Sequence, residues 1–167
     1  MSFEIVIFNQ LHLDAVDEEA LLGAVSRSNF RTLCEQYGLD PALSAPAMSY
    51  LEVLKTSDGI ASFFLLKYLA EGHRPIVIYQ WDCQAKEGAR ILSHARQGCE
   101  SDRVRQCLDV TKTIFLISLS KSQLEDIGLL LAYEVARWLA EQGRGILRDV
   151  HGDWYRLNQH TAFLPVQ

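Results

Sequence analysis

The apolar residues of this chain follow two patterns: short continuous runs, and longer segments in which they recur every three or four positions. Three runs are rich in β-branched and aromatic residues, which predicts β-strands. They are Phe3–Phe8, Pro75–Trp81 and Thr113–Leu119. The third is apolar at consecutive positions, a pattern typical of a strand that is buried on both faces.

A helical pattern extends from about residue 17 to residue 37. The polar residues 26–29 interrupt it, so we expect two helices, the second of them capped by the side chain of Asn29. Gly38 follows the last apolar position and is expected to end the second helix.

Three more helices are expected in the second half of the chain, each close to a residue that favours a helix terminus. They are a helix over about 84–97 with Asp82 as its N-cap, a short helix over Ser101–Leu108, and a long helix that begins at a Ser122-x-x-Glu125 capping box and reaches about Gln142.

The middle of the chain combines turn-forming and strongly apolar segments. Two prolines indicate a loop over residues 40–47. Residues Met48–Leu54 fit either a short strand or the lead-in to a helix. The segment Gly59–Glu71 has apolar residues on nearly every side of a helix, which predicts a buried helix capped by Ser57 and Asp58.

Residues Gly145–Leu157 are predicted to form a β-hairpin that turns at residues 151–153, a segment rich in turn-forming residues. If Gly152 and Asp153 form the turn, Asp149 faces Arg156, a favourable cross-strand pair.

Strands that alternate with helices and end in a hairpin predict an α/β (α+β) fold: a single-layer mixed β-sheet packed with helices, with a C-terminal β-hairpin. Length and composition agree with one globular domain over residues 1–167, because 49% of the residues are apolar and 22% are charged. The pattern leaves the order of the strands in the sheet open.

Charge and composition narrow the range of partners. The formal net charge of −5 disfavours contact with a phosphate backbone, so we expect no nucleic-acid partner. The first ten residues contain no Lys or Arg and no long apolar stretch, and no segment approaches the ~20 apolar residues that span a bilayer. We therefore expect a cytoplasmic protein with no membrane partner. The four scattered cysteines fit neither a disulfide framework nor a zinc ribbon, and we expect no metal and no cofactor.

Cys83 is the best candidate for a catalytic nucleophile. It follows a predicted strand and precedes a predicted helix, whose N-terminal amide groups would lower the pKa of a thiol. A nucleophilic cysteine also needs a base, and His151 or His160 would have to approach it through the fold. The neighbouring Asp82 opposes thiolate formation, and the alternative interpretation is a packed, inert thiol.

Two further patterns have both a functional and a structural interpretation. Asp149, His151 and Asp153 alternate like metal ligands on one face of a strand, but the glycine between them favours a turn. Basic residues cluster between positions 86 and 105 with acidic residues among them, which favours a solvated helix face over an anion site.

The long helix carries a second apolar stripe beside its main one. Leu129, Tyr133 and Ala136 belong to this second stripe, and small residues recur at every fourth position, which allows another helix to approach closely. We expect the stripe to be buried, either by its own chain or in a homodimer that forms through the 123–142 helix.

No motif of a known reaction class is present: the chain has no phosphate-binding loop, no His-Glu-x-x-His and no Gly-x-Ser-x-Gly. The leading hypothesis is therefore a non-catalytic binding or interaction protein that acts on another macromolecule, in concrete form a toxin-neutralising (immunity-type) protein. Its acidic residues would meet a basic protein partner, unless they only favour the first turn of a helix. These residues are Asp14, Asp17, Glu18 and Glu19. The alternative is a small cysteine-dependent hydrolase or transferase that uses Cys83 with a histidine.

Overall fold

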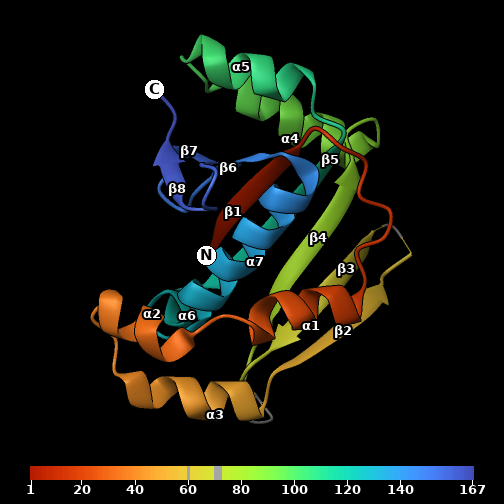
Figure 1. Cartoon of the computed structure of the whole chain (residues 1–167). Helices are drawn as coiled ribbons and strands as arrows, with labels where there is room; N and C mark the ends of the chain where they lie inside the picture. Colours follow the sequence, from red (N-terminus) through yellow and green to blue (C-terminus); the bar gives the residue numbers. More distant parts are fainter. Residues whose placement is uncertain (60, 70–72) are drawn as a thin grey trace.

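The computed structural model describes residues 1–59, 61–69 and 73–167 (Figure 1). Within these residues the chain forms one eight-stranded sheet with helices packed on both faces. The predicted α/β class, with one sheet, packed helices and a C-terminal hairpin, is confirmed. Every neighbouring pair of strands in the described residues is antiparallel.

The strand order across the sheet is β2-β3-β4-β5-β1-β6-β7-β8, so the first strand in sequence lies near the centre. The strands are β1 (Ser2–Asn9), β2 (Glu52–Ser57), β3 (Ser62–Lys67), β4 (Ile76–Asp82), β5 (Thr113–Ser120), β6 (Ile146–Arg148), β7 (Trp154–Leu157) and β8 (Phe163–Pro165).

Seven α-helices and one short 3₁₀ helix connect these strands within the described residues. They are α1 (Glu18–Ser26), α2 (Phe30–Gln36), η1 (Pro41–Leu43), α3 (Ser44–Ser49), α4 (Lys86–Gln97), α5 (Asp102–Asp109), α6 (Lys121–Leu124) and α7 (Gly128–Gly143). None of the helices in the described part of the chain combines the length and apolar character needed to cross a bilayer.

The sheet separates two apolar clusters because successive residues of a strand point to opposite faces. On β1, Ile5 and Ile7 join the cluster beneath α1, α2, α3 and α7, whereas Val6 and Phe8 join the cluster beneath α4 and α5. The other central strand, β5, alternates in the same way, which explains why both strands are apolar at consecutive positions. Figure 1 shows α7 running along β1, and these two elements are in extensive contact.

Several local predictions are confirmed. The three predicted strands are β1, β4 and β5. The helical segment 17–37 divides into α1 and α2, and the Asn29 side chain accepts a hydrogen bond from the backbone N–H of Thr32. Gly38 follows α2 with a φ of 70°, as a helix stop requires. Residues 48–54 resolve into the end of α3 and the start of β2.

The predicted helix over Gly59–Glu71 is wrong within its described residues, because β2 and β3 form an antiparallel hairpin there. Residues 60 and 70–71 of that prediction lie outside the described residues. Gly59 has a φ of 84°, and the Asp58 carboxylate accepts a hydrogen bond from the Ala61 N–H across the turn. Asp-Gly is a strong hairpin signal, and a continuous apolar run fits a strand with two apolar faces as well as it fits a buried helix.

The predicted long helix is divided into two helices, α6 and α7. The capping box lies at the start of α6 and is formed by Ser120 and Gln123 rather than by Ser122 and Glu125, because β5 extends to Ser120 and α6 follows it directly. The helix is then interrupted before α7, where the Asp126 carboxylate accepts a hydrogen bond from the Gly128 N–H at 2.6 Å.

Three further details differ from prediction. The prolines at 41 and 46 lie in η1 and α3 rather than in a loop, since Pro is compatible with the first turn of a helix. Asp82 does not cap α4; its carboxylate accepts from the Gln84 N–H in the turn before the helix. In the C-terminal hairpin Arg156 faces Ile146, so Asp149 lies in the turn rather than opposite Arg156.

Candidate functional site

Cys83 lies directly after β4, at a surface hollow with a volume of about 490 Å³. The histidine in this hollow is His12, from the loop after β1, whereas His151 and His160 lie in the turns of the C-terminal strands. The hollow is lined by His12, Cys83, Gln84, Leu92, Arg96, Asp109, Val110, Thr111 and Lys112.

The surroundings of Cys83 favour a protonated thiol. Burial raises the pKa of the Cys83 thiol and the charge of Asp82 raises it further, against smaller opposing effects of Arg96 and Lys112. The predicted helix-terminus effect is not available, because α4 begins only at Lys86. These surroundings disfavour an activated thiolate at Cys83, although a histidine lines the same hollow.

Asp149, His151 and Asp153 form a turn, as the glycine between them indicated. The Asp149 Oδ1 atom accepts hydrogen bonds from the backbone N–H groups of His151 and Asp153, both at 2.9 Å. No group of three or more His, Cys, Asp or Glu side chains in the described residues is arranged to hold a metal ion.

Two of the four N-terminal acidic residues have structural roles. The Asp17 carboxylate accepts from the Ala20 N–H and caps α1. The Glu18 carboxylate accepts at 2.7 Å from the backbone N–H of Lys55, on the edge strand β2. Asp14 and Glu19 are exposed. The position of these acids therefore agrees with helix capping and edge protection, and their contact with a basic partner stays a prediction.

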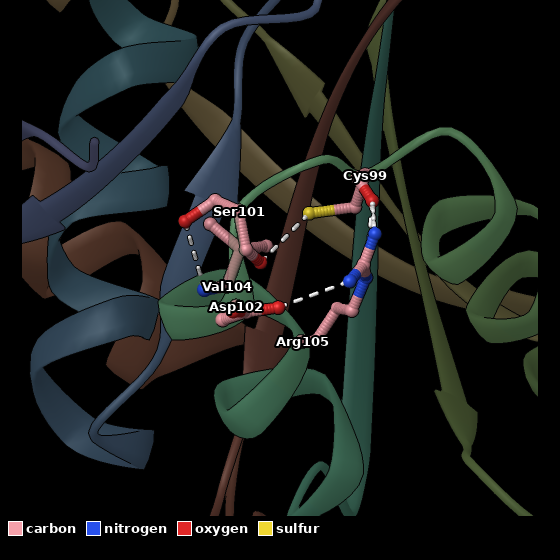
Figure 2. Close-up of polar contacts among 5 residues, drawn as sticks. All are labelled: Cys99, Ser101, Asp102, Val104 and Arg105. Atoms are coloured by element: carbon pink, nitrogen blue, oxygen red, sulfur yellow. Dashed lines mark hydrogen bonds and ion pairs between the residues drawn. The ribbon is translucent and has the colours of Figure 1, made fainter.

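The basic residues between 86 and 105 are largely engaged with acids of their own chain. Figure 2 shows Arg105 donating to the Cys99 carbonyl and to the Asp102 carboxylate, next to the Ser101 side chain that caps α5. Arg96 pairs with Asp109 at 3.1 Å. This segment has the contacts of a solvated helix face rather than those of an anion site.

The second stripe of α7 is covered mainly by its own chain. The side chain of Ala136 is 0% exposed, and the small residues at 128, 132 and 140 are buried with it. Ala136 therefore offers no surface to a second copy, and a homodimer through this helix stays a prediction. Leu129 and Tyr133 are only partly buried, because they line an open pocket.

That aromatic pocket is one of two features that the sequence interpretation missed. Its volume is about 320 Å³, and it lies between α7, the end of α2 and the strands β6, β7 and β8. The aromatic pocket is lined by Tyr37, Leu129, Tyr133, Leu147, Asp149, Tyr155 and Phe163.

Strand register places these side chains on one face. Leu147 is the direct partner of Tyr155, and Phe163 pairs with Leu157, two residues further along β7. Residues at i and i+2 share a face, so the rings of Tyr155 and Phe163 both point toward α7. Phe163 makes edge contacts with both tyrosines, with ring centroids 6.0 Å from Tyr133 and 6.4 Å from Tyr155.

The second missed feature is an incompletely covered part of the sheet, which we call the open face. On the side of α4 and α5, α4 reaches β4, but neither helix packs extensively on β2 or β3. Phe63, Tyr79 and Trp81 form an aromatic row there, with Tyr79 5.1 Å from Trp81 in a stacked arrangement and 5.5 Å from Phe63. The open face comprises Leu54, Phe63, Leu65, Val77, Tyr79 and Trp81, each exposed or partly exposed.

A sequence signal existed for the open face but not for the pocket. Residues 76–81 are apolar or aromatic at almost every position, which shows two apolar faces without showing what covers them. Tyr37, Tyr133 and Phe163 are far apart in sequence, and only the register of short strands brings their rings together.

Comparison with known proteins identified no matching family, no similar characterised protein and no similar solved structure.

Proposed function

We propose that this protein is a non-catalytic binding protein that acts on another macromolecule, and that its partner is a protein. The observation that carries the proposal is the open face, with its aromatic row of Phe63, Tyr79 and Trp81. Contiguous apolar surface of this kind is avoided on soluble monomers unless it has a partner, and Trp and Tyr are enriched at the centres of protein interfaces.

Charge on the open face favours a protein over a nucleic acid. Lys67, at the end of β3, pairs with Glu52 at 3.8 Å, and the protein carries a net charge of −5. Stacking surfaces for single-stranded nucleic acids combine aromatic rings with unpaired basic residues that follow the backbone. The aromatic row is present without such a basic groove among the described residues of β2, β3 and β4.

Site-specific photo-crosslinking tests the proposal. With p-benzoylphenylalanine at position 63, in cells that express the gene, we expect one discrete protein adduct. The matched control carries the same group at Tyr50, which is 54% exposed and lies outside the open face. Adducts of equal yield from both positions, an adduct of the chain with itself, or no adduct would contradict a specific protein partner.

The purified partner then permits a quantitative test. Tyr79→Ser removes the central ring of the aromatic row, and truncation of an aromatic hot-spot residue at the centre of an interface costs ~2 kcal/mol or more, about a thirtyfold loss of affinity. Tyr50→Ser should leave the affinity unchanged. Equal affinities of the two variants, measured by calorimetry on samples with confirmed folding, would refute the assignment of the open face.

The toxin-neutralising (immunity-type) form of this function leads to a genetic experiment. A neighbouring gene would encode a protein that arrests growth when expressed alone, and coexpression of this chain would restore growth. Restoration should be lost with Tyr79→Ser and kept with Tyr50→Ser. Absence of any toxic neighbour would leave the binding function without its immunity-type form.

A cysteine-dependent hydrolase or transferase is the alternative function. It is supported by the presence of Cys83 and His12 at one hollow, and it is disfavoured by the raised pKa of the Cys83 thiol.

A further inference from the structure

We propose that the aromatic pocket is a second binding site, which receives the positively charged side chain of a lysine or arginine from a polypeptide. The site lies at the β6–β8 end of the sheet, under α7, and is separate from the open face at the β2–β4 end. The proposal therefore does not depend on the identity of the partner that covers the open face.

The walls of the pocket are suited to a cation with an apolar stem. Tyr37, Tyr133, Tyr155 and Phe163 supply aromatic rings, and two leucines complete the apolar lining. Ring faces attract ammonium and guanidinium groups, and the methylene groups of Lys and Arg pack well against apolar walls. None of the three tyrosine hydroxyls makes a hydrogen bond with another described residue, so all three are available to a ligand.

The electrostatic character of the pocket is negative. Asp149 contributes to the lining although the residue is only 6% exposed, and Asp153 lies close by in the same turn. Burial raises the pKa of the Tyr133 hydroxyl and the charge of Asp149 raises it further, and the same two causes raise the pKa of Tyr155. A second anion in the pocket is therefore disfavoured, and a cation is favoured.

The pocket carboxylate has no cation partner among the described residues. Asp149 makes no ion pair in the described residues; its Oδ1 atom is occupied only by two turn amides. The Arg137 guanidinium group lies 5.2 Å from the Phe163 ring centroid, but it does not line the pocket and it pairs with Glu134 at 3.1 Å. Its position shows that a ring of the pocket already interacts with a cation within the chain.

The position of Tyr37 favours a side chain delivered by a polypeptide. Tyr37 is 63% exposed, so this wall of the pocket lies at the protein surface and can contact residues on either side of an inserted lysine or arginine. A free amine would leave most of this ring in water. The pocket volume of about 320 Å³ is at the lower end for ligand sites, as fits one side chain better than a large cofactor.

Titration monitored by backbone amide NMR tests the proposal with three probes at equal ionic strength. The probes are acetyl-Gly-Lys-Gly-amide, the same peptide with neutral norleucine in place of lysine, and tetramethylammonium chloride. We expect saturable shifts at Tyr133, Leu147 and Tyr155 with the lysine peptide, and binding about three- to tenfold weaker with the norleucine peptide.

Asp149→Asn isolates the charge, because the amide oxygen can still accept the two turn hydrogen bonds. We expect it to weaken binding of the lysine peptide about three- to tenfold, whereas Asp153→Asn, in the same turn but outside the pocket lining, should weaken it by a smaller factor. Tyr155→Leu keeps an apolar wall without the ring and should also weaken binding, which provides a second test if Asp149→Asn does not fold.

Three results would overturn the proposal: norleucine and lysine peptides that bind equally, equal affinities of Asp149→Asn and the wild-type protein, or shifts with tetramethylammonium but not with the lysine peptide. A natural partner that binds Asp149→Asn normally and loses affinity with Tyr79→Ser would refute the pocket and retain the proposed function. The reverse outcome would retain the pocket and refute the open face.

Discussion

Ala136→Leu is the substitution that most directly tests how α7 packs. Ala136 is 0% exposed and lies on the small-residue face of the helix, which is buried within the chain. Leucine adds three carbon atoms at a position with no solvent-exposed surface. Overpacking of this kind typically costs ~1–3 kcal/mol, because neighbouring side chains must leave their preferred rotamers.

The expected change in melting temperature follows from the size of the protein. A domain of 150–250 residues loses about 2–4 °C for each kcal/mol of destabilisation, so Ala136→Leu should lower the melting temperature by about 2–12 °C. Because Ala136 is buried within one chain, the decrease should be the same at every protein concentration.

Differential scanning calorimetry over a hundredfold range of concentration, with size-exclusion chromatography of the same samples, measures both quantities. Gln142→Leu is the matched control: it places leucine at an exposed position of the same helix, where the effect should lie within about 0.5 kcal/mol. A concentration-dependent loss of stability with a smaller elution size would show a dimer seam at Ala136. An unchanged melting temperature would show that α7 does not pack closely there.

Three further outcomes are expected. Gly143→Ala should lower stability by ~1–3 kcal/mol in denaturant titrations, because its new methyl group would overlap the buried Asn9 side chain. An equal loss in an Asn9→Gly background, which lacks the Cβ atom as well as the amide, would contradict this cause. Asp126→Ala should cost ~1–3 kcal/mol, since it removes both acceptors of the Tyr68 hydroxyl, at 2.8 and 2.9 Å, whereas Asp126→Asn should cost less. Cys83 should react with iodoacetamide at neutral pH no faster than a model thiol, and its rate should increase as the pH rises, because the pKa of the Cys83 thiol is raised. Rapid, selective labelling of Cys83 at neutral pH, located by peptide mapping, would favour the enzyme alternative.

Local sequence patterns predicted the individual elements correctly where only one structure was compatible with the pattern. Asn29 caps α2, and the runs at 3–8, 75–81 and 113–119 are strands. Caps are local hydrogen bonds over two or three residues, and central strands need apolar residues on both faces, so neither depends on the rest of the chain.

The prediction failed where an apolar run was compatible with two structures. The segment after Asp58 fits a buried helix by composition, yet Phe64 and Leu66 are buried while Phe63 and Leu65 face the open side of the sheet. The choice depends on the neighbour β4, which pairs with β3 and satisfies its backbone groups. A window of sequence does not contain that neighbour.

The candidate sites show the same limit more strongly. Sequence reasoning concentrated on Cys83, His151 and His160, because reactive residue types can be recognised individually. The structure instead brings Tyr133, Tyr155 and Phe163 into contact, through a hairpin register and a final strand that the local pattern did not predict.

The sequence by itself determined the class of the fold, the cap of α2 and the three apolar strands, because each of these follows from periodicity and hydrogen bonds within a few residues. Tertiary structure alone decided the strand order, the open face and the aromatic pocket. All three depend on which surfaces remain uncovered once every strand has a neighbour, and the strand order follows from pairings between residues distant in sequence, such as Phe8 and Ile146.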